Sequence, residues 1–425
     1  MPDSAPTRDT PSPNSSSPHS SSAGATSPSE SSPTTLSPGR TFFRAIELSG
    51  AGVHPAAWRR ADSRAEELFT AGYWLDAITA AERAGLDAVL VPDSFEAGSG
   101  GPGTVRGKLD AVAITARAAA RTTRIGLIPR VATTHTEPFH VSKAIQALDF
   151  ATLGRAGWEV TVSEGAAQAK AFGRKGAQDP VSLWQEADEA IEVVTRLWDS
   201  WEDDAEIRDL STGRFVDRDK LHYIDFVGEH FSVKGPSITP RSPQGRPIVV
   251  IRADEGPAIA VATRRADLIR IAPPDLDSAH ARRTALRTAA LAAGRDPDTL
   301  TVLLDIDIHL AGSDAAAHTE VEQLDHWSDP PHAGKSAAPR LRHLGTVASL
   351  NELLTTLAES GAADGVVLRP LAVPAATHLL AETAGTASSV DTWRGSGRAP
   401  GTLRDRLGLS RPAGRYVAIT EGVRS

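Results

Sequence analysis

Polar residues that could do chemistry recur where short apolar runs end. His54 follows the run FFRAIEL, Asp93 ends DAVLVPD, Thr133 and Thr134 follow RIGLIPRV, and Ser163 ends GRAGWEVTVS. Carboxyl, hydroxyl and imidazole groups at strand ends can bind a polar ligand, and an imidazole titrating near neutrality can also act as an acid or base. These strand ends are therefore the candidate site.

Charged residues follow the later apolar runs as well. Arg252 and Glu255 follow the run IVVI, and Arg369 lies near the end of DGVVLRP. Asp305 and Asp307 alternate with apolar residues in TVLLDIDIHL. Because alternate residues of a strand share one face, we expect at least one of these two carboxylates to face polar neighbours inside the fold.

Several candidates have a structural alternative. His54 precedes Pro55 and could simply cap a loop, and Asp93 could cap the helix that follows it. We expect Trp198 and Trp201 to pack within the protein and not to stack on a substrate.

The composition excludes several classes of function. The chain has no cysteine, so disulfides, thiolate metal sites and cysteine nucleophiles are excluded, and no His-Glu-x-x-His spacing supports a metal site. A net charge of −8 leaves no basic footprint for nucleic acid. No apolar run reaches the roughly 18 residues of a membrane span, and the N-terminus lacks the apolar core of a secretory signal. We expect a soluble cytoplasmic protein that acts on a small molecule.

The two ends of the chain differ from its middle. Residues 1–40 contain 13 serines and eight prolines. Such a stretch has too few apolar groups to offset the entropy lost on ordering, so we expect a disordered tail. Residues 384–425 form a C-terminal extension, in which TLRDRLGLSRPAGR predicts a short polar helix at 402–415 that wraps the barrel or a partner subunit.

Between these ends, strand-like and helix-like stretches alternate. Strands are predicted at 42–48, 87–93, 124–131, 156–163, 248–253, 267–272, 301–310 and 364–370. Helices are predicted at 71–85, 109–123, 138–153, 179–201, 257–265, 278–293 and 349–360. Eight strands, mostly separated by helices, indicate an α/β fold, a (β/α)8 TIM barrel over 41–383 whose site lies at the carboxyl ends of the strands.

An open doubly wound sheet is the alternative, but no Gly-x-Gly-x-x-Gly follows the first strand. A long insertion after the fourth strand, at 202–246, shows no strong periodicity, and we expect it to form a lid.

Five segments in this order resemble the bacterial-luciferase-like flavin-dependent monooxygenases, in the branch of nitrilotriacetate and dibenzothiophene-sulfone monooxygenases. They are HPAAWR at 54–59, TEPFHVSKAIQALD at 136–149, GRAGWEVTVS at 154–163, LWDSWEDDA at 197–205 and the PRSPQGRP loop. The resemblance covers nearly everything from Phe43 to Arg415 and implies the barrel fold.

The resemblance also implies the chemistry. Such enzymes use reduced FMN supplied by a separate flavin reductase, and a flavin C4a-peroxide inserts one oxygen of O2 into a small organic substrate. Carried onto this chain, it places residues beside the flavin and assigns His54 and His140 as catalytic acids or bases. The expected cofactor-binding residues are Asp93, Thr133, Thr134, Glu137, Ser163, Trp184, Arg252 and Glu255. A homo-oligomer, dimer or tetramer, is implied too.

Three positions depart from the family at its phosphate site. Pro180 and Trp184 stand where the family has His and Tyr, and Glu255 stands where it has Ser. A carboxylate ~4 Å from a phosphate costs about 4 kcal/mol at an effective dielectric near 20, unless Arg252 compensates. Two alternatives therefore stay open: a degenerate barrel that has lost flavin and acts as a binding scaffold, and, less favoured, an oxidoreductase using the deazaflavin F420.

Overall fold

The computed structural model describes residues 41–96, 103, 105–254, 256–328, 340–383 and 401–416. Residues 1–40, predicted to be a disordered tail, lie outside this part of the chain, and so does most of the predicted C-terminal extension.

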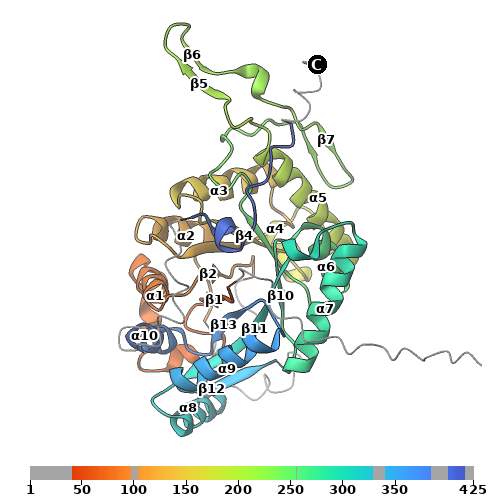
Figure 1. Cartoon of the computed structure of the whole chain (residues 1–425). Helices are drawn as coiled ribbons and strands as arrows, with labels where there is room; N and C mark the ends of the chain where they lie inside the picture. The colour runs from red at the N-terminus through yellow and green to blue at the C-terminus, as the bar shows by residue number, and fades with distance from the viewer. Residues whose placement is uncertain are drawn as a thin grey trace, which may run out of the picture. The chain divides into compact units, whose positions relative to one another are not determined.

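Eight parallel strands close into a barrel (Figure 1). They are β1 (Phe43–Glu47), β2 (Ala88–Val91), β3 (Gly126–Ala132), β4 (Gly157–Thr161), β9 (Ile248–Arg252), β10 (Leu268–Ile271), β11 (Thr301–Leu310) and β13 (Gly365–Pro370). Each pairs with the next in this order, and β13 pairs with β1 to complete the ring. The predicted (β/α)8 barrel is confirmed.

Helices surround this ring on the outside (Figure 1). They are α1 (Ala71–Arg83), α2 (Ala111–Ala119), α3 (Pro138–Ala151), α4 (Ala166–Phe172), α5 (Pro180–Trp198), α6 (Gly256–Arg265), α7 (Leu276–Ala292), α8 (Asp314–Trp327), α9 (Val347–Ser360) and α10 (Val373–Thr383). Side chains that accept hydrogen bonds from first-turn amides start several of them, as in Thr70 for α1 and Asp179 for α5.

Some elements were not predicted from the sequence. β12 (Arg342–Gly345) adds a ninth strand, parallel to the carboxyl-terminal half of β11 and paired from Asp307 onward. It has only four residues and no apolar run, which is why periodicity did not reveal it. Helices α4, α8 and α10 were also missed.

Side chains alternate between the two faces of the barrel wall. Outward residues such as Ile46, Val89 and Trp158 pack against the helices, while inward residues such as Phe43 and Leu90 form a separate cluster inside the ring. The interior cluster occupies the amino-terminal half of the barrel because its members lie early in their strands.

The insertion at 202–246 joins the end of α5 to the start of β9, and it therefore leaves the barrel at its amino-terminal end. It contains two short hairpins, β5 (Glu206–Asp209) with β6 (Arg214–Val216), and β7 (Phe226–Val227) with β8 (Ser232–Val233). The β5–β6 hairpin extends away from the barrel wall (Figure 1). The Gln244 amide donates to the Asp149 carboxylate at 2.6 Å and to the Ala156 carbonyl, just before β4, at 2.8 Å. These contacts give no support to a lid over the mouth, which lies at the opposite end.

A short C-terminal helix, α12 (Leu403–Arg406), closes that amino-terminal end. Leu403, Leu407 and Leu409 join the interior apolar cluster, so this segment is less polar in its contacts than its sequence indicated. Gly126 leaves the space for Leu403: a β-carbon there would lie 3.0 Å from a Leu403 methyl group.

Candidate active site

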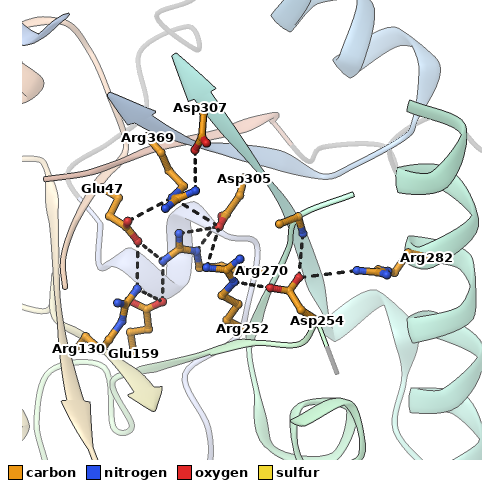
Figure 2. Close-up of polar contacts among 11 residues, drawn as sticks. Glu47, Arg130, Glu159, Arg252, Asp254, Arg270, Arg282, Asp305, Asp307 and Arg369 are labelled. Atoms are coloured by element: carbon orange, nitrogen blue, oxygen red, sulfur yellow. Dashed lines mark hydrogen bonds and ion pairs between the residues drawn. The ribbon is translucent and has the colours of Figure 1, made fainter. Parts of the chain in front are cut away.

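Charged side chains fill the carboxyl-terminal half of the barrel interior (Figure 2). They occupy inward positions near the strand ends and come from seven of the eight barrel strands, all except β2. They are Glu47, Arg130, Glu159, Arg252, Arg270, Asp305, Asp307 and Arg369.

Arg270 is the centre of this charged layer, and both it and Asp305 are completely buried. Its Nε and Nη2 atoms donate to the two carboxylate oxygens of Asp305, both at 2.9 Å. Its Nη1 lies 2.6 Å from Glu159 and 2.8 Å from Glu47. Arg130 also bridges Glu47 and Glu159, each at 3.0 Å. Bidentate pairs of this kind are what make buried charges tolerable.

The charges of this layer stabilise one another. Burial alone would raise the pKa of Glu47, but the positive charges of Arg270, Arg130 and Arg369 outweigh it and hold that pKa well below its usual value. The pKa of Glu159 is likewise lowered, because Arg130 and Arg270 outweigh the effect of burial. Burial would lower the pKa of Arg270, yet the surrounding carboxylates raise it well above normal. All these groups are charged in the folded protein at neutral pH.

Toward the mouth, the layer ends in less buried pairs. Arg369 donates to Asp307 at 2.6 Å, and burial raises the pKa of Asp307 despite this partner. Arg252 donates through Nε to Asp254 at 2.5 Å, and its Nη1 lies 4.0 Å from Asp305. The structure thus engages Arg252, which we expected to reach a phosphate, with carboxylates of the protein (Figure 2).

Three of the predicted cofactor-binding residues lie together across the ends of β3 and β4. The Thr134 hydroxyl accepts a hydrogen bond from the Ser163 amide at 3.1 Å, and the Thr133 hydroxyl donates to the Thr161 carbonyl at 3.3 Å. Thr133, Thr134 and Ser163 are all buried.

Asp93, from the neighbouring strand end, uses its carboxylate locally. It accepts from the Ser94 amide at 2.7 Å and from the Ala111 amide, the first residue of α2, at 3.0 Å. This is the helix-capping role that the sequence allowed. Burial raises the pKa of Asp93 against the effect of these two amides.

Beside these residues, four buried polar atoms have no hydrogen-bond partner within the described part of the chain. They are His135 Nδ1, Thr136 Oγ1, Ser163 Oγ and Gln168 Oε1. They come from the loops after β3 and β4 and from α4, all at the carboxyl end of the barrel. Leaving such an atom unpaired costs about 1–3 kcal/mol, so a bound molecule with a polar edge would be favoured there.

An aromatic wall adjoins the unpaired atoms. The His135 ring stacks on Phe172 with centroids 4.6 Å apart, and Phe95 meets the same ring edge-on at 4.7 Å. His135 has a φ of 69°, uncommon for a non-glycine residue and frequent at functional sites. Burial, with help from Lys175, lowers the pKa of His135, which keeps its imidazole neutral. Sequence reasoning assigned roles to the neighbouring Thr133 and Thr134 but none to His135.

The two predicted catalytic histidines are not brought together. His54 is buried, with Nε2 3.1 Å from Asp325 of α8 and Nδ1 accepting from the Ala56 amide at 3.2 Å. His140 and Glu137 are exposed at the start of α3. The structure joins none of these three side chains to another, and their roles stay predictions.

The expected phosphate end has its own carboxylate. Asp179 accepts hydrogen bonds from the Val181 and Ser182 amides at 3.0 and 3.1 Å, so the amides at the start of α5 already hold an acid. Trp184 packs, half buried, against the apolar core. Glu255 lies outside the described residues.

The sequence reasoning missed the heart of the charged layer. Glu47, Glu159 and Arg270 are each the one charged residue on the inward face of their strands FRAIE, GWEVT and LIRI, since Arg44 of the first strand lies on the outward face. Each lies two positions after a residue that faces the barrel interior, which is apolar in β1 and β10 and is Gly157 in β4. Because alternate residues of a strand share one face, this spacing was a signal that could have revealed them.

Two kinds of feature are absent from the described residues. No group of three or more His, Cys, Asp or Glu side chains there could hold a metal ion. No helix in the same residues has the length and apolar character needed to cross a membrane.

Comparison with known proteins agrees with this geometry. The luciferase-like monooxygenase family model matches residues 51–391. N-acetyl-S-(2-succino)cysteine monooxygenase of Bacillus subtilis is 33% identical over 66% of this chain and 63% of its own length. Nitrilotriacetate monooxygenase component A of Aminobacter aminovorans is 32% identical over 66% of this chain and 64% of its own. These alignments span slightly less than two thirds of the relatives.

Solved structures show the same fold. EDTA monooxygenase from Chelativorans superimposes with a TM-score of 0.77 at 21% identity, covering 88% of this chain and 99% of the other. A long-chain alkane monooxygenase gives a TM-score of 0.76 at 21% identity, covering 87% and 95%. Since the family model matches most of the chain, this protein belongs to the luciferase-like monooxygenase family.

Proposed function

We propose that this protein is the oxygenase of a two-component system, which uses reduced FMN to insert one atom of O2 into a small organic substrate. The observation that carries the proposal is the cluster of unpaired buried polar atoms at the ends of β3 and β4, on Ser163, Thr136, His135 and Gln168. It lies at the end of the barrel where enzymes of this fold keep their sites.

These residues fit the polar edge of an isoalloxazine ring, which alternates carbonyl and N–H groups. Hydroxyls can donate or accept, the Gln168 oxygen accepts, and a neutral His135 can do either according to its tautomer. When bound, reduced flavin supplies the electrons that activate O2. Phe95 and Phe172 would keep water from the reacting end of the site.

The phosphate end fits less well, because Asp179 already holds the amides at the start of α5. Weak holding of FMN suits a protein that receives reduced flavin from a separate reductase and does not keep it. The nitrilotriacetate relative carries the name component A, which supports such a partner. A homo-oligomer belongs to the same proposal.

The test is anaerobic titration of the full chain with reduced FMN, followed by flavin fluorescence and absorbance. We expect saturable binding, and oxidation of the bound flavin when air is admitted. Two outcomes would contradict the proposal. Binding of reduced F420 in place of reduced FMN would favour a deazaflavin oxidoreductase, and the absence of any flavin binding would favour a scaffold.

A matched pair of variants localises the binding. Ser163→Ala removes an unpaired hydroxyl at the mouth, and Ser142→Ala removes a buried, equally unpaired hydroxyl on α3, where the Ser142 carbonyl accepts from Trp198. We expect Ser163→Ala to weaken reduced FMN about three- to tenfold, the worth of one hydrogen bond, and Ser142→Ala to leave it unchanged. Equal affinities in both variants would place the flavin elsewhere.

A further inference from the structure

The guanidinium group of Arg340 carries a positive charge at the barrel mouth, which the carboxylates of Asp307 and Asp305 offset without forming an ion pair with it. Arg340 is half buried, and its side chain makes no hydrogen bond or ion pair with the described residues. The next residue fixes its position, since the Leu341 amide donates to the Pro273 carbonyl after β10 and the Leu341 carbonyl accepts from the Asp307 amide of β11, both at 3.1 Å.

Two further guanidiniums lie near this position. Arg369 donates to the carboxylate of Asp307, the residue whose amide binds the Leu341 carbonyl. After burial itself, the positive charges of Arg252 and Arg369 lower the pKa of Arg340, while Asp307 and Asp305 act in the opposite direction. An arginine stays protonated even so, and like charges gathered at a half-buried place are unfavourable until an anion joins them.

The deep and shallow parts of the charged layer differ in their balance. In the deep part, Arg130, Arg270 and Arg369 face Glu47, Glu159 and Asp305, so three charges of each sign compensate. Nearer the mouth, within the described residues, the cations are Arg252, Arg282, Arg340 and Arg342 and the anions are Asp254 and Asp307. Among the described residues of the charged layer, the part nearer the mouth thus holds two more positive than negative charges.

We propose that Arg340, with Arg252 and Arg369 beside it, binds a carboxylate group of the substrate, so that this oxygenase acts on anionic molecules. The statement that the protein oxygenates anionic molecules rests on the proposed function, whereas the statement that it binds a carboxylate does not. A guanidinium is suited to a carboxylate because its parallel N–H groups match the two oxygens.

The flavin phosphate is the other anion that this site could attract. The reacting ring of a flavin must be the sheltered end, and its phosphate lies at the far end of the ribityl chain. Arg369, by contrast, is buried in the barrel interior, beneath the mouth. A deep anion site next to a sheltered ring suits the substrate better than the phosphate.

The test uses calorimetric titration of the full chain with tricarballylate, succinate and benzoate, and with the uncharged amide of each. We expect carboxylates to bind at least about tenfold more tightly than their amides, and Arg340→Gln to remove that difference. Arg340→Lys should restore part of it. The control is Arg117→Gln, which removes the same charge from the exposed face of α2 and should change nothing.

The contrary results are separable. Equal binding of acids and amides, or no binding of any carboxylate, overturns the inference. If Arg340→Gln weakens FMN but not riboflavin, the site belongs to the flavin phosphate and the substrate assignment is wrong. If carboxylates bind through Arg340 while reduced FMN does not bind at all, the anion site stands and the proposed oxygenase function fails.

Discussion

The two halves of the barrel interior are built on opposite principles, although the same strands supply both. In the amino-terminal half, Phe43, Leu90, Val250 and their neighbours pack against Leu403, which α12 supplies as a plug. In the carboxyl-terminal half, the next inward residues of seven of the strands are charged (Figure 2). The apolar half needs only to exclude water, whereas the charged half is stable only if every partner is present. The site therefore lies above the charged layer, which is rigid but would be disrupted by the loss of a single partner.

Removing the centre of the charged half should have the largest effect. Arg270→Met leaves Asp305, Glu159 and Glu47 with fewer partners in a buried place, and we expect a loss of about 3–5 kcal/mol in the free energy of unfolding. Urea denaturation followed by circular dichroism measures it.

A second substitution shows whether the loss comes from uncompensated charge. Adding Asp305→Asn to Arg270→Met removes one stranded carboxylate and should recover part of the stability. The matched control is Leu268→Ala, two residues earlier on β10 and facing the apolar half, where Asp305→Asn should bring no recovery. Simple additivity in both backgrounds would contradict the idea that the two halves differ.

Acid should affect the two halves differently. The pKa values of Glu47 and Glu159 are lower in the folded than in the unfolded chain, because arginines outweigh the effect of burial. Their contribution is therefore complete above the unfolded pKa of about 4.5 and is lost as pH falls through the lower folded values. We expect stability to decline below about pH 5, and Glu47→Gln to flatten that decline.

The apolar half provides the control for pH. Leu403→Ala opens a cavity among uncharged groups and should lower the free energy of unfolding by about 2–5 kcal/mol. We expect this loss to be the same at every pH. A Leu403→Ala curve that converges with the wild-type curve in acid would show that titration is not confined to the charged half.

How far the sequence could predict each half follows from the same contrast. Strands such as AVLV were recognisable because apolar runs are local, and eight of them determine the barrel. The partners of Glu47 lie on β3, β10 and β13, more than 80 residues away, and no local pattern pairs them. Ser163 and Thr134 were predicted through their strand ends, yet the unpaired state of the Ser163 hydroxyl depends on the packing of α4 and the β3 loop.

The difference between the two halves should become smaller toward the mouth, and substitution of Asp307 tests by how much. Its partner Arg369 also binds Glu47, and the Asp307 side chain is 17% exposed, so water can take over part of its role. We expect Asp307→Asn to cost about 1 kcal/mol or less in unfolding free energy, against several for Asp305→Asn in the fully buried layer. The same substitution removes a negative charge beside Arg340 and should tighten the binding of tricarballylate. Equal losses of stability at both positions would mean that the deep layer extends to the mouth, leaving no surplus charge there to receive a ligand.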